Sequence, residues 1–131
     1  MERTDRQKVG DAAEQLVAER LAARGWCILA RNAHFGRSEL DIVATDPGPP
    51  ARLVVVEVRW RRSHEYGLPE ETFDYHKRAH LRVGLSRLLD VGRLPGGDQL
   101  PHLPLALDLA VVEPGVGGEP RVRLYRDALG G

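Results

Sequence analysis

The chain has 131 residues, equal numbers of basic and acidic side chains, and a single cysteine, Cys27. That length suits one domain with its own hydrophobic core, and we expect residues 1–131 to form a single domain. Zero net charge excludes a strong overall attraction to polyanions, and one cysteine excludes an internal disulfide or a zinc site built from thiolates. No apolar run approaches the roughly 20 residues of a membrane helix, and the N-terminus lacks an apolar leader. We therefore expect a cytoplasmic protein with no membrane partner.

The first half of the chain is expected to contain one helix and three strands. Apolar residues at helical spacing predict a helix over about 5–24, ended by Gly25. Strands are expected at 26–30, 39–44 and 52–60, with a polar turn at 33–38. Because a short Pro/Gly loop separates the second and third strands, they are expected to pair as an antiparallel hairpin.

The second half is expected to add a helix over about 69–90, a buried strand at 105–112 and an edge strand at 121–125. The apolar side of this helix is expected to consist of Phe73, Leu81, Leu85, Leu88 and Leu89. The order α-β-β-β-α-β predicts an α/β fold in which helices flank a mixed sheet.

Two acids stand out because they interrupt strands that otherwise read as buried. Asp41 lies in Ser38-Glu39-Leu40-Asp41-Ile42-Val43, and Glu57 in Leu53-Val54-Val55-Val56-Glu57-Val58-Arg59. Burying an unpaired carboxylate costs several kcal/mol, so such groups shift their pKa, find a partner or bind a metal. If the hairpin pairs as its loop suggests, the two acids approach each other, and their oxygen ligands suit Mg²⁺ or Mn²⁺.

Each helix contributes one charged residue on or beside its apolar stripe. Glu14 follows Gly10 by one turn and precedes Val17, so it borders the apolar face. Lys77 lies between Phe73 and Leu81 at the same spacing. Taken alone, Glu14 fits a flanking surface carboxylate and Lys77 a side chain that covers apolar surface.

Several segments occur together in one order and spacing that resembles a known family. They are Gly10-Asp11-Ala12-Ala13-Glu14, Arg31-Asn32, Glu39-Leu40-Asp41, Val56-Glu57-Val58-Arg59, Tyr66-Gly67-Leu68-Pro69, Lys77 and Leu107-Asp108-Leu109. Their combination resembles the YraN-like family of small bacterial proteins, over roughly residues 9–112. That family is similar to restriction-endonuclease-like nucleases and Holliday-junction resolvases, which share an αβββαβ core and a PD-(D/E)xK metal site.

The resemblance implies a site for Mg²⁺ or Mn²⁺ held by Asp41, Glu57 and Glu14. The lysine of the motif falls on Arg59, where the chain departs from the pattern. Arginine stays protonated and binds phosphate, but it does not act as a general base. Lys77 is the candidate substitute for the missing lysine. The implied activity is a metal-dependent endonuclease acting on DNA, with branched DNA as a substrate and a homodimer as the assembly.

Basic side chains near these acids are candidates for contacts with DNA or another nucleic acid. They are Arg59, Arg61 and Arg62 around Trp60 at the end of the third strand, and Lys77 and Arg78 on the second helix. Arginine and lysine bind phosphates, and an exposed tryptophan stacks on bases. Because the net charge is zero, we expect weak binding that depends on salt concentration.

Two other interpretations fit the same residues. Arg59 favours a degenerate member of the family that binds nucleic acid without cutting it. In the other interpretation, Glu57 and Arg59 form a structural ion pair, and the chain is a protein-interaction module. Asp108 is expected to pair with a buried basic group or to cap a turn, and it is given no catalytic role.

Overall fold

A computed structural model describes residues 5–61 and 75–128, with side chains for residues 8–61 and 79–128. The elements are α1 (Asp5–Ala23), β1 (Cys27–Phe35), β2 (Ser38–Asp46), β3 (Arg52–Trp60), α2 (Tyr75–Val91), β4 (Leu105–Pro114), the 3₁₀ turn η2 (Val116–Gly118) and β5 (Pro120–Tyr125). In this part of the chain, neither helix combines the length and hydrophobicity that crossing a membrane requires.

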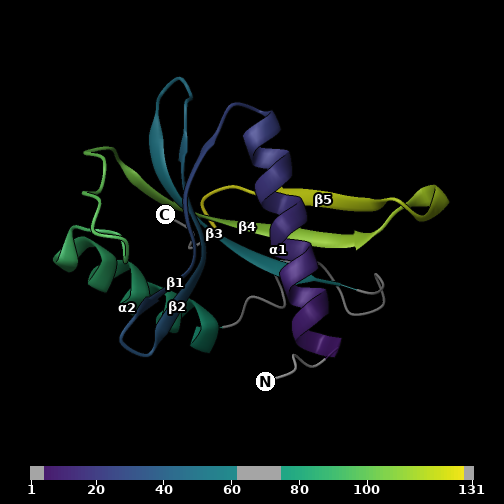
Figure 1. The fold of residues 1–131 in the computed structure, drawn as a ribbon, viewed down its shortest axis with the longest axis horizontal. Helices are drawn as coiled ribbons and strands as arrows, with labels where there is room; N and C mark the ends of the chain where they lie inside the picture. The colour runs from purple at the N-terminus through teal and green to yellow at the C-terminus, as the bar shows by residue number, and fades with distance from the viewer. Residues whose placement is uncertain (1–4, 62–74, 129–131) are drawn as a thin grey trace.

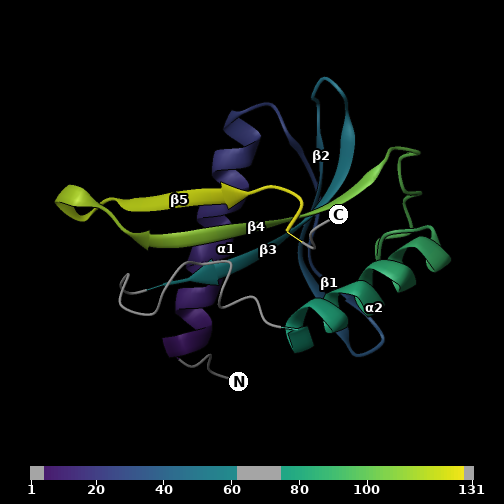
Figure 2. The same ribbon diagram turned by 180° about the vertical axis from the view of Figure 1, so that it is seen from behind.

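The five strands form one mixed sheet in the order β1-β2-β3-β4-β5. Only β3 and β4 are parallel, whereas the other three neighbouring pairs are antiparallel. Figures 1 and 2 show α1 and α2 on opposite sides of this sheet. The predicted α/β fold with a mixed sheet flanked by helices, and the β2–β3 hairpin within it, are confirmed.

Each helix packs on its own apolar cluster. Ala13, Val17 and Leu21 of α1 are buried with β-branched and alanine residues of β2, β3 and β4. Leu81, Leu85 and Leu88 of α2 are buried on the other side, together with residues of all the first four strands. We call these the α1 side and the α2 side of the sheet. The unbroken β-branched run of β3 follows from this arrangement, because both of its faces are covered.

The first strand and its turn differ from the sequence-based expectation. β1 continues to Phe35 and pairs with β2 up to Phe35↔Ser38, so the turn consists of Gly36 and Arg37 rather than 33–38. Gly36 has a φ of +63°, which glycine adopts without strain. The polar residues of the expected turn are the outward side of a strand whose alternate residues, Ala33 and Phe35, are buried.

Helix α2 lies close to the β1–β2 hairpin. A Cβ added to Gly84 would lie 3.1 Å from Leu40 Cδ2, so glycine permits the close approach. The Arg87 guanidinium donates a hydrogen bond to the Phe35 carbonyl oxygen at 2.9 Å and ties the hairpin end to the helix. Leu89, expected on the apolar side, is instead 55% exposed, because it follows the fully buried Leu88 and neighbouring residues of a helix point about 100° apart. The expected start of this helix near residue 69, and Phe73, lie outside the described residues.

A fully buried acid on β4 fastens the C-terminal residues to the sheet. Asp108 Oδ2 lies 2.6 Å from Arg126 Nε, and Asp108 Oδ1 accepts a hydrogen bond from the Asp127 amide at 3.0 Å. Arg126 also pairs with Asp46 at 2.7 Å and stacks over the Trp26 ring at 5.3 Å. We call these residues the Asp108 network. Asp108 thus pairs with a basic group as expected, although that group, Arg126, is 38% exposed rather than buried.

Candidate functional site

The sheet splits between β2 and β3, and the predicted acids lie at the split. The two strands pair only from Ile42↔Val56 to Asp46↔Arg52. Before Ile42, β2 pairs with β1 alone, and after Val56, β3 pairs with β4 alone. In Figure 1 the lower β1–β2 hairpin consequently runs downward while β3, β4 and β5 run to the right. We call this split the fork.

Asp41 bridges the fork through its side chain. Its Oδ2 accepts a hydrogen bond from the Val58 amide at 2.9 Å, so the carboxylate lies against the peptide that joins Glu57 to Val58. Leu40 packs on the α2 side and Ile42 on the α1 side, so the alternation of β2 breaks at Asp41. Where the β2–β3 hydrogen-bond ladder ends, the Asp41 side chain thus replaces a backbone carbonyl oxygen as the acceptor for the Val58 amide.

Glu14 of α1 is the carboxylate that interacts electrostatically with Asp41. Its side chain is only 13% exposed, and burial together with the charge of Asp41 raises its pKa to about 7. Arg31 and Asn32 oppose this rise in pKa: Arg31 Nη2 lies 3.9 Å from Glu14 Oε2, and the Asn32 side chain forms a hydrogen bond with Glu14. The arginine is distant for an ion pair and also donates to Gln15 Oε1. The negative charge of Glu14 is therefore only partly compensated.

Glu57 belongs to the same end of the fork but points to the other side of β3. Its side chain is 4% exposed, and Val56 and Val58 on either side of it pack on the α1 side. Alternation therefore puts Glu57 and Arg59 on the α2 side. Among the described residues, no three histidine, cysteine, aspartate or glutamate side chains are grouped so as to hold a metal ion. The structure brings Glu14 and Asp41 together, and the set of three acids stays a prediction.

The basic residues predicted to bind nucleic acid separate at the end of β3. Trp60 is 40% exposed and lies on the α1 side, whereas Arg59 and Arg61 continue the alternation on the α2 side. Arg62 lies outside the described residues. Lys77 and Arg78 belong to α2, but their side chains are outside the described part of the chain.

Sequence reasoning missed the partners of Glu14 and a further buried acid on β4. The segment Arg31-Asn32 was recognised only as part of a family pattern, yet it supplies the partners of Glu14. No sequence pattern indicates this role, because the left-handed φ of +50° at Asn32 is seen only in the structure. The buried acid Glu113 and its ion pair with Arg123 at 2.8 Å were also missed, because β4 was expected to end at residue 112.

The fold and the fork define a class: an α/β protein with a restriction-endonuclease-like core, in which a five-stranded mixed sheet lies between two helices. The chain belongs to the uncharacterised protein family UPF0102, whose sequence profile matches residues 13–110. The resemblance to the YraN-like family is thereby confirmed.

Relatives span nearly the whole chain. The UPF0102 protein of Symbiobacterium thermophilum is 39% identical over 123 residues, which cover 94% of this chain and 97% of the relative. That of Dehalococcoides mccartyi is 34% identical over 126 residues, 96% of each chain. Among solved structures, Pyrococcus furiosus SfsA in complex with Ca²⁺ matches with a TM-score of 0.39 and 17% identity. That match covers 93% of this chain and 64% of that chain.

Proposed function

We propose that this protein binds nucleic acid and hydrolyses its phosphodiester bonds with a divalent cation bound at the fork, in the manner of PD-(D/E)xK endonucleases. The observation that carries the proposal is the incompletely compensated pair of Glu14 and Asp41 at the end of a buried strand pair. Burial and the charge of Asp41 raise the pKa of Glu14 to about 7. Perturbed carboxylates of this kind gather at functional sites.

The donor chemistry of the fork suits Mg²⁺ or Mn²⁺. Glu14 and Asp41 would hold the ion with their carboxylate oxygens, and Glu57 is the third acid that the family pattern assigns. Two carboxylates at about 4 Å repel by roughly 4 kcal/mol at an effective dielectric near 20, and a cation removes that repulsion. When bound, such a cation lowers the pKa of a coordinated water and stabilises the leaving oxygen.

The chain's own residues have separable roles in this proposal. The Val58 amide holds Asp41 Oδ2 in place and leaves Oδ1 for another ligand. Arg31 and Asn32 orient the Glu14 carboxylate. Arg59 carries a guanidinium, a group that binds phosphate bidentately and does not serve as a general base, so it would bind a substrate phosphate.

The direct test incubates the protein with branched and linear DNA in Mn²⁺ and compares Asp41→Asn with the wild type. Loss of a metal ligand is expected to lower the cleavage rate by at least about 10- to 100-fold, the range seen for residues that only support a ligand. Asp98→Asn makes the same chemical change in an exposed loop and should leave the rate unchanged. Equal rates for Asp41→Asn and Asp98→Asn would contradict the assigned site.

A second candidate, a family member that binds nucleic acid without cutting it, is favoured by Arg59 at the position of the motif's lysine. Arg59→Lys distinguishes the two. If the wild type is inactive and Arg59→Lys gains Mn²⁺-dependent cleavage, the non-cutting form is supported. If the wild type cleaves and Arg59→Lys changes the rate little, Arg59 is a phosphate ligand of an active enzyme.

A further inference from the structure

The end of the sheet beyond the fork carries arginines at matching positions on β3 and β5, on either side of β4. Arg59 on β3 pairs in register with Val111, which pairs with Arg123 on β5. One step further along, the Arg61 amide donates to the Val112 carbonyl oxygen, and Glu113 pairs with Arg121. The side chains of neighbouring strands at equal register lie side by side.

These arginines share one side of the sheet. Val58 on β3 and Val122 and Leu124 on β5 pack on the α1 side, so the odd-numbered residues of both strands face the α2 side. Tyr125 confirms the assignment because it packs against the α2-side cluster. We call Arg59, Arg61, Arg121 and Arg123 the arginine face.

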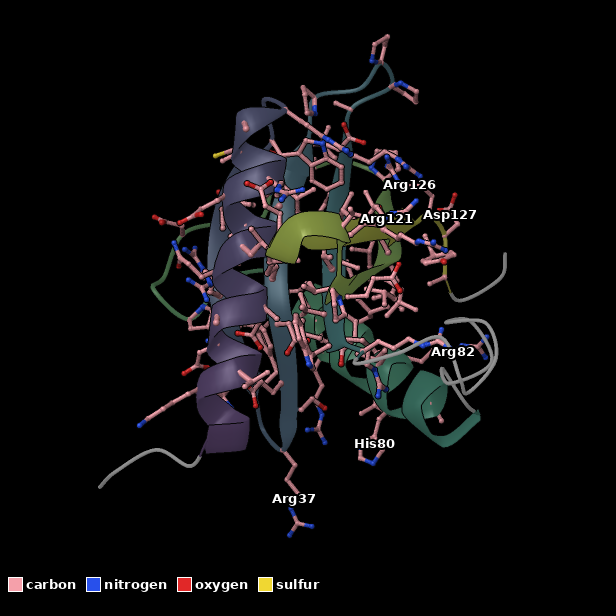
Figure 3. All side chains as sticks on the ribbon, turned by 90° about the vertical axis from the view of Figure 1, so that its right-hand side faces the viewer. Arg37, His80, Arg82, Arg121, Arg126 and Asp127 are labelled. Atoms are coloured by element: carbon pink, nitrogen blue, oxygen red, sulfur yellow. The ribbon has the colours of Figure 1, made fainter. Side chains whose placement is uncertain are left out.

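Two buried acids lie on the same side of these strands as the arginine face. Glu57 and Glu113 are 4% and 1% exposed, respectively. Arg123 Nε pairs with Glu113 Oε1 at 2.8 Å, and Arg123 also forms a hydrogen bond with Tyr125, so its guanidinium is fixed in position. Arg121 is exposed at the edge of the sheet, and Figure 3 labels it on β5. Among the described residues, these ends of β3, β4 and β5 thus carry four arginines and two acids on one side, in a chain of zero net charge.

Helix α2 does not account for this surface, because it packs chiefly on β2 and β1, on the other arm of the fork. Because β4 lies between β3 and β5, arginines at equal register on these two strands are about 9.6 Å apart, whereas those two residues apart along a strand are about 6.6–6.8 Å apart. The second spacing is close to that between successive phosphates of a nucleic-acid strand. Guanidinium groups also bind phosphate oxygens bidentately.

We propose that the arginine face is the docking surface for the phosphate backbone of nucleic acid, with Arg121 and Arg123 of β5 as phosphate ligands beyond the fork. This inference rests on the proposed function, since it describes how the substrate of that site would be held. It assigns β5, which carries none of the predicted site residues, to substrate binding.

Arg121 is the residue to change. It is exposed on an edge strand, where substitutions usually alter stability by less than about 0.5 kcal/mol. Arg123 is less suitable, because removing it would leave the buried Glu113 carboxylate without its 2.8 Å partner. The matched control is Arg93→Ala, an exposed arginine that contacts the Gly97 carbonyl oxygen within its own loop. Thermal melts of both variants check that the fold is intact.

The experiment measures binding of a fluorescent duplex DNA by anisotropy in EDTA, over a series of salt concentrations. We expect Arg121→Ala to weaken binding several-fold and to reduce the slope of log K against log[salt] by about 0.9, the contribution of one phosphate contact. Arg93→Ala should change neither quantity. Absence of salt-dependent binding by the wild type, or equal behaviour of the two variants, would overturn the inference.

Two further outcomes separate this inference from its alternatives. If the wild type binds duplex and Arg121→Ala binds equally well, the docking surface is wrong, while cleavage that depends on Asp41 would still support the proposed site. Conversely, Arg121-dependent binding without any cleavage supports the docking surface and contradicts the catalytic proposal. A labelled polyglutamate of equal charge is the second probe, and Arg121-dependent binding to it as tight as to DNA would assign the surface to an acidic protein instead.

Discussion

Two sets of carboxylates lie against the α1 side of the sheet, and they differ in the positive charge around them. In the Asp108 network, Asp108 has Arg126 at 2.6 Å and the Asp127 amide at 3.0 Å, and Arg126 is shared with Asp46. At the fork, Glu14 has Arg31 only at 3.9 Å and a second carboxylate, Asp41, beside it. The first set fastens the C-terminal residues to the sheet, whereas in the second the negative charge is only partly compensated, as the proposed cation site requires.

The largest effect expected from this comparison is on stability. Asp108→Ala leaves Arg126 Nε and the Asp127 amide without their buried acceptor. Breaking a buried pair costs about 3–5 kcal/mol, and the low end applies because Asp46 still contacts Arg126. We therefore expect the free energy of unfolding, measured by urea denaturation, to fall by about 3 kcal/mol.

The matched variant for that measurement is Asp41→Asn, which keeps an oxygen acceptor for the Val58 amide. It removes a charge that repels Glu14, so the stability should stay the same or rise slightly. Comparable losses in Asp108→Ala and Asp41→Asn would mean that both sets are structural, and the contrast between them would be lost.

How far the sequence predicts each set depends on where its partners lie. The buried strands and the approach of Asp41 to the Glu57 strand follow from β-branched runs and a short loop, which are local signals. The partner of Asp108 comes from Arg126, beyond the last strand, and no pattern along β4 points to it. The arginine face was likewise missed, because it depends on the register of β3, β4 and β5. The parallel strands β3 and β4 pair although they are far apart in the sequence.

A moderate effect is expected from divalent cations, and it should be confined to the fork. A ligand that binds only the folded state stabilises it by RT ln(1 + [L]/Kd), which is about 1.4 kcal/mol at 10 mM Mg²⁺ for a Kd of about 1 mM. We expect Mg²⁺ to raise the free energy of unfolding of the wild type and not that of Asp41→Asn.

Sodium at equal ionic strength serves as the control for this measurement. Sodium should have little effect on the wild type, because screening alone does not supply a ligand to the carboxylates. Stabilisation by Mg²⁺ that survives in Asp41→Asn would place the ion elsewhere and remove the support that the fork lends to the proposed function.

The smallest expected effect is the dependence of stability on pH. Glu14 has a pKa of about 7 in the folded protein against a model value of 4.5, so the folded state binds more protons between those values. Stability contributed by protonated Glu14 is therefore present at low pH and is lost as pH rises through about 7. Partial exposure of the group limits the change to the order of 1 kcal/mol.

Glu14→Gln isolates this effect, because it removes the titrating group while keeping the shape of the side chain. The wild type should lose stability relative to Glu14→Gln between pH 5 and 8 in EDTA. The pKa of Asp108, raised to about 6 by burial, produces a decline of the same sign in both proteins, so it cancels in their difference. Adding Mg²⁺ at pH 8 should reverse the order, since the wild type then gains a ligand that Glu14→Gln holds less well. A parallel pH dependence of the two proteins would contradict the raised pKa of Glu14 in the folded protein.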